Sequence, residues 1–257
     1  MPSPVDREPI DLDDEDLELL ARFSELDTIR AQQEANKRTR RNLLALGFVL
    51  LSLQRIRPGP VATPTGKPLP VLSPRQVRTT LDKFIDSTTW DMSALAESYR
   101  TGGLTLAEWQ AQMLARVKST HYGAASLQRG GYANMRPADM AEVERIILHE
   151  YRYLSRFGRD VKKGLPLDGR FVRRAEMYGK AGRGTFYEFM SADMSRAGYT
   201  EEANVIRPGD NCGGCIEQTA RGWVALGQLV PIGNRTCLSN CRCALQYRNV
   251  LGDVVQG

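Results

Sequence analysis

The sequence predicts a mainly α-helical protein, with a helical arm, a helical body and a small cysteine-rich α+β knuckle at its C-terminal end. Three features predict this fold. Apolar residues recur at helical spacing through most of the 257 residues, six prolines fall between residues 58 and 74, and all five cysteines fall between residues 212 and 243. We therefore expect an arm over residues 1–57, a proline-rich linker over 58–74, a helical body over 75–204 and a cysteine-rich module over 205–257.

The composition is ordinary for a folded protein, but its charge is unevenly distributed. With 257 residues, of which 42% are hydrophobic and 25% charged, the chain is long enough to bury a core. Ten acids and three arginines give residues 1–30 a charge of −7, and the net charge of +5 therefore leaves +12 on the remainder. A body this basic favours contact with polyanions, with an evenly solvated basic surface as the alternative.

The N-terminal arm is expected to form one or two helices. Residues 12–56 contain no proline and one glycine, and their apolar residues recur at helical intervals. Within them, Leu43–Leu53 is apolar on every side, yet it is shorter than the roughly 20 residues that cross a bilayer. No secretory signal precedes it, so we expect no membrane contact, synthesis in the cytosol and reduced thiols. We interpret the run as a docking segment for another subunit, with a place in the core as the alternative.

The first two helices of the body carry local start and stop signals. Ser73 and Pro74 provide an N-cap followed by a proline at the first helical position. Thr105 and Glu108, three residues apart, form a capping box that opens the second helix. The Gly-Gly pair that begins at Gly130 is expected to end it.

Two further helices are expected in the body. The third begins near Pro137 and is predicted to end at Gly158, and the fourth runs from about residue 170 to residue 197. Glycines at positions 179, 182 and 184 fall inside the fourth helix, where each costs about 1 kcal/mol relative to alanine. Close packing or a kink is therefore expected there.

The five cysteines have a spacing that is typical of a metal knuckle. Cys212 and Cys215 flank a Gly-Gly turn that points two sulfurs at one place, and a second group follows about twenty residues later. That group, Cys237, Cys241 and Cys243, holds one thiol more than a tetrahedral site needs. Structural zinc or another thiophilic metal, disulfides and reduced thiols all remain open. If metal binds, we predict Cys212, Cys215, Cys237 and Cys241 as its ligands, with Cys243 as the alternative fourth ligand.

No motif in the sequence predicts catalysis. The two histidines, His121 and His149, stand alone, and neither belongs to a His-Glu-x-x-His zinc motif. The glycines between residues 179 and 184 are not followed by the Gly-Lys-Ser/Thr of a phosphate loop. A thiol nucleophile at Cys212 or Cys215, with a histidine brought near it by the fold, is the open alternative. We therefore predict that the protein is not an enzyme.

One basic stripe is predicted between residues 152 and 163. Arg152, Arg156, Arg159 and Lys163 recur at intervals of three and four residues, which places them on one helical face. Such a face can track the phosphates of a nucleic acid, and an acidic protein surface would fit it equally well. A solvated face opposite the core is the alternative interpretation.

The cysteine-rich end resembles a known family. The run Asn240-Cys241-Arg242-Cys243 precedes an apolar strand and follows both a Cys-x-x-Cys pair and the turn Pro231–Gly233. Upstream stand the helical stretch 173–178, with its Arg-x-x-Glu pattern, and then Gly198. Together these features resemble the phage-Mu-type minor head proteins, which are also called head morphogenesis proteins. Many members carry a histidine shortly before the Asn-Cys-Arg-Cys run, whereas this chain has Cys237 at a slightly longer spacing.

The resemblance, which covers roughly residues 104–248, implies a role as a structural virion protein. It implies a minor head component of a tailed bacteriophage, made in the host cytoplasm and acting in capsid assembly near the portal vertex. The implied partners are the portal protein, the major capsid protein and packaged DNA, with several copies in one assembly. Two other functions remain alternatives: a zinc-knuckle protein that binds DNA directly, and a thiol-dependent enzyme.

Overall fold

A computed structural model describes residues 74–256 of the chain except 208 and 210. These residues all lie in one compact unit. The arm, the Leu43–Leu53 docking segment and the linker up to residue 73 lie outside the described residues, so these interpretations stay predictions. No helix within the described ranges has both the length and the apolar character that crossing a bilayer requires.

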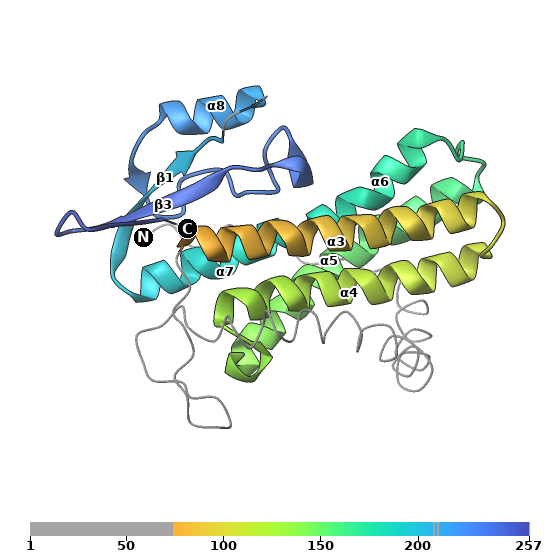
Figure 1. The fold of residues 1–257 in the computed structure, drawn as a ribbon, viewed down its shortest axis with the longest axis horizontal. Coiled ribbons are helices and arrows are strands. Elements are labelled where there is room, and N and C mark those ends of the chain that lie inside the picture. The colour runs from red at the N-terminus through yellow and green to blue at the C-terminus, as the bar shows by residue number, and fades with distance from the viewer. Residues whose placement is uncertain (1–73, 208, 210, 257) are drawn as a thin grey trace. The chain divides into compact units, whose positions relative to one another are not determined.

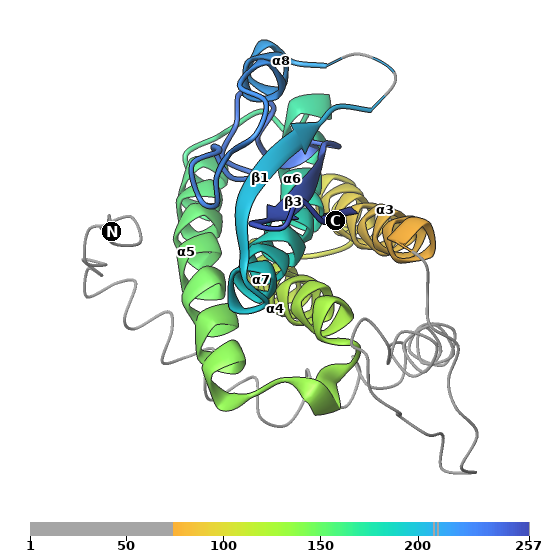
Figure 2. The same cartoon turned by 90° about the vertical axis from the view of Figure 1, so that its left-hand side faces the viewer.

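The described residues are mainly helical, with a small antiparallel sheet and a cysteine cluster near the C-terminus, which confirms the predicted fold class. Helix α4 packs against α3, α5 and α7, and α3 also packs along α6 (Figure 1). The sheet and α8 lie together on one side of the helices, over α7 and the start of α3 (Figures 1 and 2). The helices are α3 (Pro74–Arg100), α4 (Leu106–Arg129), α5 (Pro137–Lys162), α6 (Gly169–Lys180), α7 (Gly182–Arg196) and α8 (Gly213–Ala220), with short 3-10 turns η1 (Tyr132–Asn134) and η2 (Leu238–Asn240).

Helix α4 begins and ends where its sequence predicts. The Thr105 side chain accepts a hydrogen bond from the backbone N–H of Glu108, and the Glu108 carboxylate accepts one from the backbone N–H of Thr105. At the other end, Gly130 takes the left-handed conformation with a φ of 71°, which glycine adopts without steric strain. Local capping chemistry therefore fixes both ends of α4.

Helix α5 does not end at Gly158, as the sequence predicted, but continues to Lys162. The reason lies in tertiary packing. A Cβ atom at position 158 would lie 2.0 Å from Nε2 of Gln110, a side chain of α4. The Gln110 side chain thus packs directly over Gly158, and a glycine inside a helix costs only about 1 kcal/mol, which packing can offset.

The helix expected over residues 170–197 is two helices, α6 and α7, which meet at Ala181. The predicted close packing at its glycines is confirmed. A Cβ at Gly179 would lie 2.7 Å from backbone atoms of Thr89 in α3, and one at Gly184 would lie 2.9 Å from the carbonyl oxygen of Ile232. The glycines thus let α6 approach α3, and let α7 approach the loop that leads to the second cysteine group.

The sheet has the strand order β2-β1-β3-β4 and is antiparallel throughout. Its centre is the pair β1–β3, in which Val205 faces Ala244 at the end nearest the cysteines. The Asn249 side chain closes the β3–β4 hairpin, because its Oδ1 accepts hydrogen bonds from the backbone N–H groups of Leu251 and Asp253. The strands are β1 (Tyr199–Val205), β2 (Val224–Ala225), β3 (Ala244–Asn249) and β4 (Val254–Gln256).

One hydrophobic cluster joins the helices to the cysteine-rich end. It contains Leu81 from α3, Phe186 from α7 and Tyr247 from β3, together with the buried cysteines Cys215 and Cys241. The Tyr247 hydroxyl also lies 2.9 Å from Oγ of Ser191 on α7. The described residues on both sides of the domain boundary predicted at residue 204 therefore share a core.

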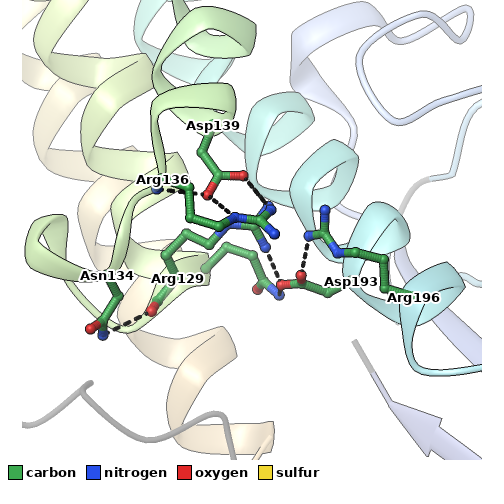
Figure 3. Close-up of polar contacts among 7 residues, drawn as sticks. Arg129, Asn134, Arg136, Asp139, Asp193 and Arg196 are labelled. Carbon is green, nitrogen blue, oxygen red and sulfur yellow. Dashed lines mark hydrogen bonds and ion pairs between the residues drawn. The ribbon is translucent and has the colours of Figure 1, made fainter.

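A buried ionic network holds together the ends of α4, α5 and α7 (Figure 3). The guanidinium group of Arg129, at the end of α4, forms ion pairs with Asp139 of α5 and Asp193 of α7. Arg136 reaches Asp139 as well, and Arg196 reaches Asp193. The carboxylate of Asp139 therefore lies between two arginines, which keeps it ionised in spite of its burial.

Candidate metal centre

Two loops bring the five cysteines together. Cys212 is the N-cap residue of α8, and Cys215 lies in the first turn of that helix. Cys237 precedes the 3-10 turn η2, Cys241 follows it, and Cys243 stands immediately before β3. All five thiols are free of disulfide bonds, which leaves their sulfur atoms available as ligands.

Glycine at position 214 lets the two loops meet. A Cβ atom there would lie only 2.7 Å from Oγ1 of Thr236, the residue before Cys237, whereas a Cβ at the neighbouring Gly213 would meet no atom within 4 Å. The close approach of the two loops thus depends on glycine at position 214 but not at position 213.

The sulfur atoms have the spacing of a metal site. Sγ of Cys215 lies 3.5 Å from Sγ of Cys237 and 3.6 Å from Sγ of Cys241. Tetrahedral zinc with bonds of about 2.3 Å holds its sulfurs about 3.8 Å apart, close to both distances. Two trios, Cys212–Cys215–Cys237 and Cys215–Cys241–Cys243, each have all sulfurs within 4.8 Å of one another. Cys215 belongs to both trios and is the centre of the cluster.

The five thiols differ in acidity. Burial would raise the pKa of Cys212, but hydrogen bonds from Cys215 and Cys237, including their backbone N–H groups, lower it to about 7. Burial, together with the neighbouring thiols of Cys212 and Cys215, raises the pKa of Cys237 to about 12. The pKa of Cys243 is raised by its contact with Cys241 and then by burial. Because a metal binds the thiolate form, Cys212 is the thiol best prepared to bind one first.

Buried polar side chains support the loops around the cluster. The Asn204 amide donates hydrogen bonds to the carbonyl oxygen of Cys215 and to the Thr219 hydroxyl. Its oxygen accepts one, at 2.6 Å, from the Arg235 guanidinium group, which also donates to the carbonyl oxygen of Val230. Both Asn204 and Arg235 are buried. Sequence reasoning missed these two residues, because single buried polar side chains in a strand and a loop leave no spacing pattern.

The structure brings together all the cysteines that the sequence proposed as ligands. Cys241 and Cys243 are both buried and both lie close to Cys215. The central position of Cys215 places it in any ligand set built from either trio. The choice between Cys237 and Cys243 as the fourth ligand, beside Cys212, Cys215 and Cys241, remains the prediction made from spacing.

Neither histidine belongs to the cysteine trios. His121 is buried, its Nδ1 lies 2.7 Å from the Thr185 hydroxyl, and burial lowers its pKa to about 4. His149 is exposed and lies edge-on to the ring of Tyr153. In the part of the chain that the structure describes, the groups with metal-ligand spacing consist of cysteines alone.

The basic stripe on α5 is only partly exposed. Arg156 and Lys163 are exposed, whereas Arg152 and Arg159 are partly buried. A guanidinium nitrogen of Arg159 donates to the Ser155 hydroxyl at 3.3 Å. Arg152, Arg156 and Arg159 lie within α5, and Lys163 is the residue that follows its end. Their role in binding a nucleic acid or an acidic partner stays a prediction.

Comparison with known proteins gives no relative from which a function could be transferred: no family model, curated protein or solved structure matches this chain. The arrangement of the cysteines is therefore the main guide to function. Sulfurs at these distances are compatible with a site for a thiophilic metal ion. Such a site, with three of its thiols buried in a core, is suited to holding loops in place.

Proposed function

We propose that this chain is a structural component of a tailed-bacteriophage particle, a minor head protein that acts in capsid assembly near the portal vertex. Its cysteine cluster holds a structural zinc ion, with Cys212, Cys215, Cys237 and Cys241 as ligands and Cys243 as the alternative fourth. In this role the protein is not an enzyme, and it resides in the virion head after synthesis in the host cytoplasm.

The observation that carries this proposal is the burial of the cluster inside a core shared with the helical body. Cys215, Cys241 and Cys243 are buried together with Phe186 and Tyr247. Structural zinc sites are closed and contribute directly to folding, whereas a catalytic site keeps a position open to substrate. A metal held here would tie α8, β3 and the helices into one unit.

The two stretches that carry the family resemblance also lie against each other. Nζ of Lys180 on α6 lies 3.2 Å from the Glu176 carboxylate and 3.0 Å from Oδ1 of Asn240, in the turn that precedes Cys241. Glu176 belongs to the Arg-x-x-Glu stretch, and Asn240 opens the Asn-Cys-Arg-Cys run. Lys180 thus links Glu176 to Asn240, which supports the interpretation of the two stretches as parts of one unit rather than as separate chance matches.

The partners follow from the resemblance and from the charge of the chain. The proposed partners are the portal protein, the major capsid protein and packaged DNA, and several copies act in one assembly. The charge of +12 outside the first 30 residues is suited to a position near dense DNA. The acidic first segment and the Leu43–Leu53 run are proposed to contact the neighbouring protein subunits.

The proposal is tested by mass spectrometry of purified particles from a phage that carries this sequence. We expect the chain in mature heads or in portal-containing assembly intermediates, cross-linked to the portal or major capsid protein. Its absence from all particles would refute the structural role.

A thiol-dependent enzyme is the second candidate, favoured by the pKa of about 7 at the half-buried Cys212. Replacement of Cys212 by serine separates the two functions. A structural site predicts lost thermal stability and lost metal, whereas an enzyme predicts a stable fold that has lost a measurable turnover.

A further inference from the structure

Two arginines far apart in the sequence converge on one carboxylate at the junction of α3, α7 and the segment after β1. Nη2 of Arg183, in the first turn of α7, lies 2.7 Å from Oδ1 of Asp82 on α3. Nη1 of Arg207, two residues beyond β1, lies 2.8 Å from Oδ2 of the same carboxylate. A single acidic side chain thus stands between two guanidinium groups, and its charge cannot neutralise both.

The two guanidinium groups keep donors that this carboxylate does not satisfy. Nη1 of Arg183 and Nη2 of Arg207 are buried and have no hydrogen-bond partner within the described residues. The Arg183 side chain as a whole is only 6% exposed. A buried donor without an acceptor costs about 1–3 kcal/mol, and more when it is charged. Among the described residues, the cluster is therefore short of acceptor oxygens and of negative charge.

Further groups that favour an anion face the same place. The Tyr187 hydroxyl on α7 lies within the electrostatic reach of Arg183, Arg207 and Arg78, and of Asp82. Arg78 stands one turn before Asp82 on α3. Arg78 and Tyr187 thus lie near enough to this cluster to interact electrostatically with it.

The carboxylate lies at the solvent side of the cluster. The Asp82 side chain is 31% exposed and that of Arg207 is 25% exposed, whereas Arg183 lies beneath them. Rotation of Asp82 about its side-chain bonds would take its carboxylate into water and open the space between the two guanidinium groups. Between the two guanidinium groups, the Asp82 carboxylate occupies the place that an external oxyanion would take.

We propose that Arg183 and Arg207 form a binding site for a phosphate group, and that the Asp82 carboxylate fills this site when no phosphate is bound. A phosphate offers more acceptor oxygens and more charge than a carboxylate, so it can pair with the donors that Asp82 leaves unsatisfied. The group is inorganic phosphate or a backbone phosphate of DNA. The site is independent of the cysteine cluster and of the proposed role in particles.

The test uses the full chain and follows thermal unfolding as sodium phosphate replaces sodium chloride at constant ionic strength. Saturable stabilisation by phosphate is expected, because a ligand that binds only the folded state raises its stability. Arg207→Gln should weaken the apparent phosphate affinity by about tenfold or more, since it removes one charged hydrogen-bond donor group. Asp82→Asn should strengthen it, because the competing carboxylate is gone.

Two features of the design keep the outcome decisive. Arg207 is partly exposed, so its replacement is better tolerated than that of the buried Arg183. Arg170→Gln is the matched control, because it removes the same charge from a side chain that is 77% exposed and pairs with Asp168 at the start of α6. Phosphate affinity in this variant should equal that of the original protein.

A DNA oligonucleotide added in competition identifies the source of the phosphate. Displacement of phosphate by DNA, lost in Arg207→Gln, assigns the site to the nucleic-acid backbone, and binding of inorganic phosphate without displacement assigns it to the free anion. Equal stabilisation by phosphate and chloride would overturn the site. So would an Arg207→Gln variant that binds phosphate as well as Arg170→Gln does, or weaker binding in Asp82→Asn.

Discussion

Replacement of Arg129 by methionine is expected to destabilise the protein by about 3 kcal/mol, because the loss of one partner from a buried ion pair costs about 3–5 kcal/mol. The Arg129 side chain is 5% exposed and pairs with both Asp139 and Asp193 (Figure 3). The lower end of the range applies because Arg136 still neutralises Asp139, and Arg196 still neutralises Asp193. The guanidinium carbon of Arg129 lies 4.9 Å from the centre of the Phe189 ring. Methionine retains an apolar side chain over this ring, so the substitution removes the charge and keeps the packing.

The matched control is Arg196→Met, which removes an arginine from the same Asp193 carboxylate. Its side chain is 44% exposed and pairs within one helix turn, so a loss of about 0.5 kcal/mol is expected. Urea denaturation at pH 7 measures both variants, with the midpoint compared at unchanged m-value. Equal losses for the two arginines would refute the view that burial makes the Arg129 network important.

The same pair of variants has a predictable pH dependence. Hydrogen bonds from Arg136 lower the pKa of Asp139 most, burial opposes them, and a hydrogen bond from Arg129 lowers it further. The pKa of Asp139 therefore lies well below its usual range. A carboxylate with a lowered pKa stabilises the fold above its unfolded pKa of about 4, and this contribution is lost as the pH falls below that value. The destabilisation caused by Arg129→Met should therefore shrink in acid, while remaining constant between pH 6 and pH 8.

Three further predictions concern a histidine, a glycine and the arm. Burial lowers the pKa of His121 to about 4, so as the pH falls below about 6.5 the unfolded state takes up a proton before the folded state does. The free energy of unfolding should therefore drop by roughly 3 kcal/mol towards pH 4. His121→Gln should remove this part of the drop, and an unchanged pH profile would contradict the prediction. Gly214→Ala should lower the melting temperature and metal affinity, because its Cβ would lie 2.7 Å from Oγ1 of Thr236, whereas Gly213→Ala should not; equal effects would exclude close approach as the cause. Deletion of residues 1–70 should leave a folded body, seen by circular dichroism, yet abolish incorporation into particles, and normal copy number in heads would disprove the docking role of the arm.

The parts of the fold that sequence could predict are those set by local chemistry. Thr105 and Glu108 bond to each other's backbone, and Gly130 needs only its own φ angle, so both ends of α4 were predicted correctly. The gathering of five cysteines within residues 212–243 was likewise visible in the sequence, because a shared ligand leaves a spacing pattern.

The parts that sequence could not predict depend on partners distant in the chain. Gly158 was predicted as a helix end, but it lies within α5, where the Gln110 side chain of α4 packs over it. Asp82 and Arg183 are 101 positions apart, and Asn204 and Arg235 are 31 apart. Such contacts depend on how the helices and the sheet pack, and no periodicity records them.

The metal content of the purified full-length chain tests the central claim most directly. Elemental analysis of protein prepared under reducing conditions without chelators should find one zinc ion per chain. Cys215→Ser should lose that ion together with thermal stability, because Cys215 belongs to both sulfur trios, while Cys243→Ser should retain it, because Cys237 is the proposed fourth ligand. A chain that folds to the same stability with no thiophilic metal bound, or a Cys215→Ser variant that keeps its zinc, would contradict the account.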